Sequence, residues 1–310
     1  MKKKLLIAGS LLLLSGVLHL LLSNAQRDAL TANAVDGTVS LSNFSRDSLI
    51  ALEGEWEFYW KEWVSPQNPA RNAPGYSKLP ESWCNLEYEG AHLPAQGYGT
   101  YRLRITGLHD GEIYGLYQPE LLTNYRLLIN GQELLRDGNP GTSRKTSVPS
   151  FHPQVTAFTS RNNTVEIILQ TSNYHYRKSG IWRPPYFGAF NTIQQYRQNR
   201  TIIEALLIGG LLIIGLYHIV IYLYREQEHS ALYFGLFSLL SVIRVATTGE
   251  HLFTSWFPFI SWDIARRLEF ALPVFGAWFF LKFLNALFPN EAMKKITAYY
   301  SIQTLVVSIP

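Results

Sequence analysis

The apolar residues of this chain are concentrated after Arg200, in runs long enough to cross a lipid bilayer. A membrane-spanning helix needs roughly 20 predominantly apolar residues, and residues before Arg200 form no comparable run except at the N-terminus. The sequence therefore predicts two parts that face different solvents, a water-exposed part and an α-helical transmembrane bundle. The expected spans are residues 201–224, 231–249, 270–288 and 296–310.

The fourth run is shorter than the others. As a helix, residues 296–310 would reach only about 22 Å, which is less than the roughly 30 Å of the hydrocarbon core. We therefore expect the bundle of residues 201–310 to be incomplete, with the chain ending inside a span.

The N-terminus has the pattern of a targeting segment. Three lysines precede an apolar stretch from Leu5 to Leu22, and the small residues Ser23 and Ala25 follow at the positions that a signal peptidase reads. Residues 1–25 are predicted to be a signal peptide, or alternatively an uncleaved anchor helix. In either case the lysines stay inside, which predicts a multi-pass protein of the cell inner membrane with residues 26–200 in the periplasm or another extracytoplasmic space.

Residues 33–199 show the short alternating runs of a β domain. In "TYRLRI" the apolar side chains alternate with Arg102 and Arg104, which is the period of a half-buried strand. Asn130-Gly131 lies between two apolar runs and predicts a tight hairpin, because both residues tolerate a positive φ. Strands separated by Gly, Pro and Asn turns favour an antiparallel sandwich or jelly roll.

The segment "LEGEWEFYW" places large aromatic side chains on one face of a predicted strand. Trp56, Phe58 and Trp60 alternate with other residues, which suits a wall of the core better than a binding platform. The glutamates at 53, 55 and 57 invite comparison with catalytic carboxylates, but alternation alone supplies no second carboxylate at the required separation. We therefore expect these glutamates to lie on a solvated face of the strand.

The order of these segments resembles a known fold. "LEGEWEFYW", "LPESW", "GYGTYRLRI", "NYRLLINGQEL" and "NNTVEIILQTSN" follow one another as in the galactose-binding-like jelly roll, which also occurs in sugar-binding modules of glycoside hydrolases. The resemblance covers most of residues 52–188. It implies an all-β jelly-roll domain whose ligands, when present, sit on loops at one rim.

The segment "SNYHYRKSGIW" and the loops "LPESW" and "DGNPGTSRK" are therefore candidates for that rim. Aromatic rings cover the apolar faces of a sugar, and cationic side chains donate hydrogen bonds to hydroxyls or carboxylates. The alternative is that these rings fasten the last strand to the sandwich. The candidate ligand-binding residues are Trp83, Tyr174, His175, Tyr176, Arg177 and Trp182.

Ionisable residues inside the predicted spans are candidates for coupling. Burial of charge in lipid is costly, so such residues usually pair with one another. Glu204 lies near the outer start of the first span and Arg244 near the outer end of the second, which puts both at a similar depth. We expect a Glu204–Arg244 pair with Glu269 as the alternative partner, or separate contacts with the outer headgroups.

The membrane half resembles a receptor family. "GLYHIVIYLYR", "SALYFGLFSLLSVIR" and "TTGE" are similar to the bacterial receptors with seven transmembrane helices and diverse intracellular signalling modules. The resemblance implies an output module such as a cyclase, kinase or phosphatase, and this chain departs from it by ending at the fourth span.

These features predict the sensor and membrane part of a signal-transduction receptor. The partners would be the lipid bilayer, a carbohydrate or another small polar ligand, and a second copy of the chain in a homodimer. The alternatives are a membrane-anchored glycan- or partner-binding module without signalling and, as a weaker option, a membrane-tethered glycoside-active enzyme. No catalytic residue, metal site or cofactor is expected, because the sequence holds no hydrolase, metalloprotease or nucleotide motif. The net charge of +4 is scattered and does not favour nucleic acid, and Cys84 has no partner for a disulfide within the chain.

Overall fold

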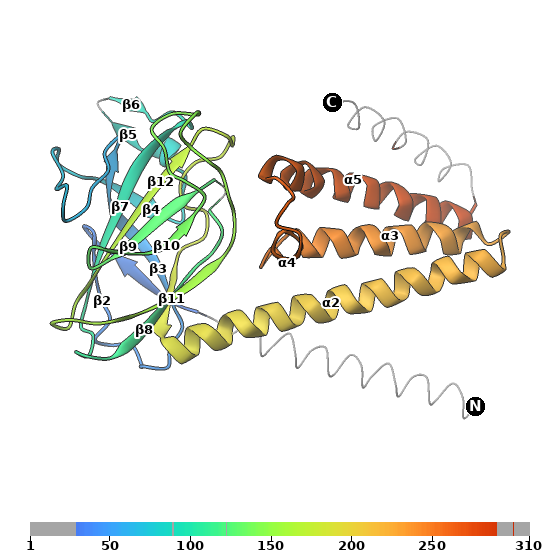
Figure 1. The fold of residues 1–310 in the computed structure, drawn as a ribbon, viewed down its shortest axis with the longest axis horizontal. Helices are drawn as coiled ribbons and strands as arrows, with labels where there is room; N and C mark the ends of the chain where they lie inside the picture. The colour runs from blue at the N-terminus through green and yellow to red at the C-terminus, as the bar shows by residue number, and fades with distance from the viewer. Residues whose placement is uncertain (1–28, 89, 122, 290–299, 301–310) are drawn as a thin grey trace. The chain divides into compact units, whose positions relative to one another are not determined.

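The computed structural model of the chain describes residues 29–88, 90–121, 123–289 and 300 (Figure 1). The chain divides into two compact units, Met1–Asn199 and Arg200–Pro310. The predicted signal segment, residues 1–25, lies outside the described residues. The same holds for the predicted fourth span, residues 296–310, apart from Tyr300.

The first unit is a β domain whose strands come from short alternating segments. One 3-10 turn, η1 (Trp83–Asn85), interrupts them after β4. The strands are β1 (Leu30–Ala34), β2 (Thr38–Ser40), β3 (Ile50–Trp60), β4 (Gly75–Leu79), β5 (Glu87–Tyr88), β6 (Ala91–His92), β7 (Gly97–Thr106), β8 (Ile113–Gln118), β9 (Tyr125–Ile129), β10 (Gln132–Asp137), β11 (Gln154–Thr159), β12 (Val165–Asn173) and β13 (Tyr186–Ala189).

Eleven of these strands form one large, mainly antiparallel sheet, and β5 and β6 form a separate two-stranded sheet. The path of the large sheet runs β10-β9-β12-β7-β3-β13-β8-β11, and β10 approaches β11, so the sheet nearly closes into a barrel. β1 and β2 join as parallel strands, β1 against β3 and β2 against β7. The predicted fold class, an all-β domain followed by helices of membrane-spanning length, is confirmed.

The core of the β domain follows from the alternation seen in the sequence. Tyr101, Leu103 and Ile105 of β7 are fully buried, whereas Arg102 and Arg104 of the same strand lie on the other face. Trp56 and Phe58 of β3 are likewise buried, which confirms the predicted core wall. Each buried side chain of this size contributes roughly 1.5–3 kcal/mol relative to exposure, so these faces fix the register of the sheet.

The opposite face of β3 and β7 carries an ion-pair network. The Arg102 guanidinium lies 2.6 Å from a Glu166 carboxylate oxygen and 3.4 Å from a Glu57 oxygen. Tyr59 donates a hydrogen bond of 2.9 Å to the same Glu57 carboxylate. Glu57 is therefore held by neighbouring strands on an outer sheet face, in agreement with the solvated face predicted there.

The predicted hairpin connects β9 and β10. Asn130 and Gly131 have φ values of 49° and 80°, the left-handed conformations that a two-residue turn of this kind requires. The Asn130 side chain also accepts a hydrogen bond of 2.9 Å from the Glu166 backbone N–H of β12. The turn thus sets the register of β9 with β10 and ties both to the neighbouring strand.

Helix α2 (Phe190–Tyr224) begins directly after β13. Its first turns pack against the sheet, where Ile193 is fully buried with Leu49 and Tyr117. Gly115 of β8 permits this approach, because a Cβ at Gly115 would lie 3.0 Å from the Cβ of Ile193. The helix therefore starts earlier than the Thr201 expected from the sequence, since its first residues are amphipathic and cover the sheet.

The second unit contains the rest of α2 with α3 (His229–Ala246), α4 (Leu252–Trp256) and α5 (Trp262–Leu287). Within the described residues, α2, α3 and α5 are long and apolar enough to cross a membrane. α5 begins at Trp262 rather than near residue 270, because Ser261 caps it: the Ser261 hydroxyl accepts a hydrogen bond of 3.4 Å from the Ile264 N–H. Pro273 lies inside α5 without ending it.

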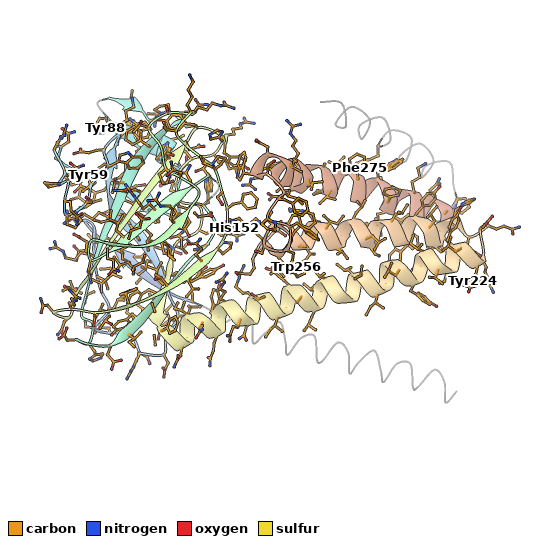
Figure 2. The ribbon with its side chains drawn as sticks, in the orientation of Figure 1. Tyr59, Tyr88, His152, Tyr224, Trp256 and Phe275 are labelled. Carbon is orange, nitrogen blue, oxygen red and sulfur yellow. The ribbon has the colours of Figure 1, made fainter. Side chains whose placement is uncertain are left out.

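The helices of this unit pack through aromatic rings and glycines. The ring centroids of Phe237 and Phe280 lie 5.2 Å apart and join α3 to α5. A Cβ at Gly235 of α3 would lie 3.1 Å from the carbonyl oxygen of Gly215 on α2, so small residues allow close backbone approach. Trp256 at the end of α4 and Tyr224 at the end of α2 have exposed side chains (Figure 2), as is typical of residues at a membrane interface.

Candidate functional site

The three loops predicted to form a ligand rim gather at one end of the β domain. β12 ends at Asn173 beside Gly97 at the start of β7, and the segment 174–182 continues from there. The Gly141 N–H donates a hydrogen bond of 3.0 Å to the Ser172 hydroxyl, and the Tyr174 hydroxyl donates one of 2.6 Å to the Thr142 carbonyl. The grouping of loops expected from the sequence is thus present.

Within this group, segment 172–182 is held by hydrogen bonds within itself and to neighbouring loops. The Asn173 side-chain amide donates to the carbonyl oxygens of Ala95, Tyr176 and Lys178, at 2.9, 3.0 and 3.0 Å. Ser179 is buried, and its hydroxyl lies 2.8 Å from the Ser82 hydroxyl. The segment is therefore a fastened connection between β12 and β13.

Trp83 belongs to the core of the domain rather than to a binding surface. Its side chain is 1% exposed and its ring stacks on Phe58, with centroids 6.1 Å apart. The indole N–H donates a hydrogen bond of 2.9 Å to the Pro94 carbonyl. A ring that is covered on its faces and paired at its nitrogen offers nothing to a ligand, so the interpretation of Trp83 as a ligand residue is corrected.

The remaining rim candidates divide into anchored and exposed side chains. Burial raises the pKa of the Tyr174 phenol, which stays protonated as a donor to Thr142. His175 Nε2 lies 3.0 Å from the Ser147 carbonyl oxygen, and the Tyr176 backbone N–H donates to Asn173. Arg177 and Trp182 are exposed, and the Lys178 ammonium lies 4.6 Å from the centre of the Trp182 ring. Within segment 174–182, Arg177, Lys178 and Trp182 are therefore the side chains most open to a ligand.

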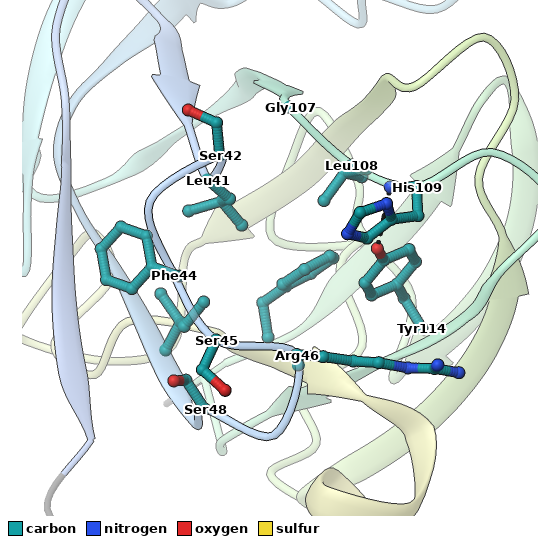
Figure 3. Close-up of a pocket in the computed structure, with 13 residues that line it drawn as sticks. Leu41, Ser42, Phe44, Ser45, Arg46, Ser48, Gly107, Leu108, His109 and Tyr114 are labelled. Carbon is teal, nitrogen blue, oxygen red and sulfur yellow. Dashed lines mark hydrogen bonds between the residues drawn. The ribbon is translucent and has the colours of Figure 1, made fainter.

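A pocket that sequence reasoning missed lies at the opposite end of the same strands (Figure 3). β7 ends at Thr106, and Gly107, Leu108 and His109 then form one wall, whereas residues 41–48 form the other. Tyr114 of β8 and residues 187–188 of β13 complete it. The pocket has a volume of about 180 Å³ and lies at the end of the sheet where α2 begins.

The floor of this pocket is apolar and its rim is polar. Phe187 and Tyr114 are buried, as are Leu41, Ile50 and Leu108 below the rim. The Tyr114 hydroxyl accepts a hydrogen bond of 3.1 Å from the His109 backbone N–H, as Figure 3 shows. The rim contains the side chains Ser42, Ser45, Arg46, Ser48 and His109.

Arg46 connects this pocket to a second hollow. Its guanidinium forms an ion pair with the Glu112 carboxylate. The second hollow, of about 390 Å³, is lined by Arg46, Glu112 and the first residues of α2, Phe190 and Asn191. The pocket and the start of the helix therefore share one charged side chain.

The coupling candidates form a cluster of opposite charges in the second unit. Arg244 lies 3.8 Å from Glu269, which also pairs with Arg266 of the same helix. The Glu204 carboxylate accepts hydrogen bonds of 3.1 Å from the Glu250 backbone N–H. The structure thus pairs Arg244 with the alternative partner, Glu269, and places Glu204 at the turn before α4.

A further ion pair closes this cluster. The Arg200 guanidinium of α2 lies 3.0 Å from the Glu250 carboxylate, whose side chain is 2% exposed. Three arginines and three glutamates therefore balance one another where the helices meet α4. Glu250 is the most deeply buried partner of these ion pairs. Arg200 and Glu250 were not among the coupling residues predicted from the sequence.

Among the described residues, no group of three or more His, Cys, Asp or Glu is placed to hold a metal ion. The thiol of Cys84 is free of disulfides and lies 3.1 Å from the Ser179 hydroxyl.

The membrane half of the chain matches a known family model. Residues 200–309 match the model of a family described as 7TM diverse intracellular signalling, which confirms the resemblance seen in their sequence. Together with the three long apolar helices, this match makes the chain a multi-pass membrane protein in contact with the lipid bilayer. No curated protein matched the sequence.

Solved structures similar to the β domain are glycoside hydrolases that are much longer than this chain. A β-glucuronidase from Faecalibacterium prausnitzii is 13% identical with a TM-score of 0.34, over 45% of this chain and 31% of the enzyme. A glycosyl hydrolase family 2 member from Bacteroides cellulosilyticus is 14% identical with a TM-score of 0.35, over 45% and 20%. A GH2 β-galacturonidase from Eisenbergiella tayi is 12% identical with a TM-score of 0.31, over 45% and 24%. The chain thus spans less than a third of the length of each enzyme.

Proposed function

We propose that this chain is the sensor and membrane part of a signal-transduction receptor. The β domain binds a small ligand, and the helices relay the binding event across the membrane. The observation that carries the proposal is the direct connection between sheet and helix, because β13 ends at Ala189 and α2 begins at Phe190. The match of residues 200–309 to a signalling family supports the same conclusion.

The first turns of α2 are packed tightly against the sheet, so they cannot move independently of it. Ile193 is fully buried against Leu49 and Tyr117, and the rings of Tyr117 and Tyr196 meet edge to face at 5.6 Å. Close-packed interiors transmit displacement rather than absorb it. A ligand that favours one arrangement of β8 and β13 therefore biases the position of the first turns of α2.

The charge cluster of the second unit is the element that this bias would repack. Arg200 and Glu204 belong to α2, and both contact Glu250 in the turn before α4. A shift or rotation of α2 within the bundle must break or exchange these contacts, because an unpaired buried charge is strongly destabilising. Discrete partner exchange gives the bundle two states instead of a continuous range.

The proposal also includes an orientation and an output. We place residues 26–200 in the periplasm or another extracytoplasmic space of the inner membrane, since the N-terminal lysines favour the inside. We assign no catalysis to this chain, and the output, a cyclase, kinase or phosphatase, would lie elsewhere in the receptor. A homodimer would bring two such outputs together.

The test changes the contact between sheet and helix without a ligand. In Gly115→Ala the added Cβ would meet Ile193 at 3.0 Å and the Phe190 Cα at 3.1 Å. Gly75→Ala is the matched control, because its Cβ would have no neighbour nearer than the Phe58 carbonyl oxygen at 3.7 Å. Hydrogen exchange of the full chain in lipid nanodiscs is measured for both variants.

A relay predicts that Gly115→Ala changes exchange in residues 190–199 and also in the cluster around residues 248–256. The change should be about fivefold or more, which corresponds to a coupling free energy of about 1 kcal/mol. Gly75→Ala should leave residues 248–256 unchanged. If Gly115→Ala alters only residues of the β domain, the relay is wrong and the alternative, an anchored binding module without signalling, takes its place.

A further inference from the structure

The pocket between residues 41–48 and β13 has the composition of a binding site for one class of small molecule. We propose that it binds a small carboxylic acid with an apolar body, about the size of a substituted benzene ring. This inference rests on the proposed receptor function, because it names the class of ligand that the sensor domain would bind. Binding itself is independent of any relay.

The size and the floor of the pocket set the apolar part of the ligand. The pocket volume is about 180 Å³, and its floor includes the rings of Phe187 and Tyr114 together with Leu108. A cavity of about 150 Å³ lined by similar side chains holds a benzene molecule. One ring or a short alkyl chain with one small polar group therefore fills this space, and a disaccharide does not fit.

The polar groups of the pocket include hydrogen-bond donors and one positively charged side chain, Arg46. The Arg46 guanidinium lies at the rim, and the His109 ring makes no hydrogen bond or ion pair with a described residue. The Tyr114 hydroxyl accepts from the His109 backbone N–H, so its own proton remains available. Charge-assisted donors of this kind recognise a carboxylate.

The same pocket lacks what a sugar requires. Among the described residues that line it, none is Asp, Glu, Asn or Gln, so the side-chain acceptors for a ligand's own hydroxyl protons are limited to hydroxyl oxygens and one nitrogen of a neutral His109 ring. A buried sugar hydroxyl without an acceptor costs binding free energy. The lining therefore favours an acid with one polar end over a polyol with hydroxyls all round.

Binding of a carboxylate would act on the start of α2 through a change of partner. Arg46 is paired with Glu112, and both side chains are partly exposed, so the pair is weak and open to exchange. A ligand carboxylate that takes Arg46 releases Glu112, which lines the adjoining hollow with Phe190 and Asn191 of α2. The loop also touches β13 directly, since a Cβ at Gly188 would lie 2.6 Å from the Ser48 carbonyl oxygen.

The experiment titrates the full chain in nanodiscs with sodium phenylacetate by calorimetry. Phenylacetamide has the same shape without the charge, and D-galactose represents the sugars; empty nanodiscs correct for partition into lipid. Arg46→Gln removes the proposed anion partner, and its urea midpoint shows whether it folds. Arg161→Gln is the matched control, because Arg161 lines a different hollow of about 300 Å³.

We expect phenylacetate to bind about tenfold or more tightly than phenylacetamide, with D-galactose weaker still. Arg46→Gln should lose the preference for the acid, and Arg161→Gln should keep it. Equal binding of acid and amide, or loss of the preference in Arg161→Gln alone, would overturn the assignment. Absence of phenylacetate binding would overturn it too, whether or not Gly115→Ala shows a relay.

The relay is read separately from binding. Hydrogen exchange of residues 248–256 is compared with and without saturating phenylacetate. Binding that depends on Arg46 but leaves these residues unchanged would establish the site and refute the receptor function. A change there with Gly115→Ala but no binding of the acid would refute the ligand class and leave the receptor function standing.

Discussion

Replacement of Trp83 by alanine tests whether this residue belongs to the core or to a ligand-binding surface. The side chain is 1% exposed and donates a hydrogen bond of 2.9 Å to the Pro94 carbonyl. Removal of a buried Trp costs about 3–5 kcal/mol through the lost transfer free energy and the cavity. With a urea m-value of about 2 kcal/mol/M for a domain of this size, a loss of about 4 kcal/mol lowers the unfolding midpoint by about 2 M.

Trp182→Ala is the control for this prediction. Trp182 is 43% exposed and its contact with Lys178 is a cation–π interaction at 4.6 Å, which is worth about 0.5–1 kcal/mol at an exposed site. Its midpoint should fall by less than about 0.5 M. The midpoints are measured by pulse proteolysis of the full chain in nanodiscs in a urea series. Equal shifts for Trp83→Ala and Trp182→Ala would refute the burial argument and return Trp83 to the ligand surface.

Two further predictions concern charges. The hydrogen bond with Arg136 holds the pKa of Glu133 below its usual value, against a smaller opposing effect of burial. The ionised Glu133 carboxylate therefore stabilises the fold above the pKa that it has in the unfolded chain, and this stabilisation is lost as the pH falls through its folded pKa. Glu133→Gln should therefore lower the free energy of unfolding by less than about 1 kcal/mol at pH 7, which is the scale of a solvent-screened ion pair. The urea midpoints of the variant and the wild type should converge at acidic pH. A difference between the two midpoints that stays the same at every pH would contradict this. In the membrane half, Glu269→Gln leaves Arg244 and Arg266 without their carboxylate and should lower the melting temperature in detergent. The exposed Glu226→Gln is its control, and equal melting temperatures for both variants would show that the cluster is not structural.

Local signals in the sequence predicted the parts of the fold that depend on few residues. Asn130-Gly131 adopts the two positive φ values of the expected turn, because the conformation is a property of these two residues. The alternation around Tyr101 likewise predicted which face of β7 is buried. The parallel pairing of β1 with β3 and of β2 with β7 was not predicted, since nothing within β1 or β2 specifies a partner distant in the chain.

The ligand site was harder to predict, because burial is decided by tertiary packing. Segment 172–182 is dense in aromatic and cationic side chains, yet Asn173 and Ser179 fasten it to neighbouring loops. The pocket at the other end is built from four separate segments with common residues such as Ser42 and Leu108. A weak signal existed, since the serine-rich loop before β3 and the Gly107–His109 turn each follow a strand.

The sequence predicted the depth of the coupling residues in the membrane but not which ion pairs they form. Glu204, Arg244 and Glu269 do lie in one cluster, as the antiparallel spans implied. Which pairs form depends on the rotation of each helix about its axis, and Glu269 lies one turn from Arg266 on the face that reaches Arg244. Rotation is set by packing contacts such as Phe237 with Phe280, which sequence spacing alone does not reveal.

The position of β13 in the sheet determines when the β domain can finish folding during synthesis. β13 lies between β3 and β8, so β8 and β11 have no connection to β3 until residues 186–189 have been made. Chains fold from the N-terminus as they emerge, and unpaired strand edges are prone to wrong associations. The nascent domain must therefore keep two open sheet edges apart until the residue before α2 appears. Completion of the sheet and synthesis of α2 then become consecutive steps of one assembly process.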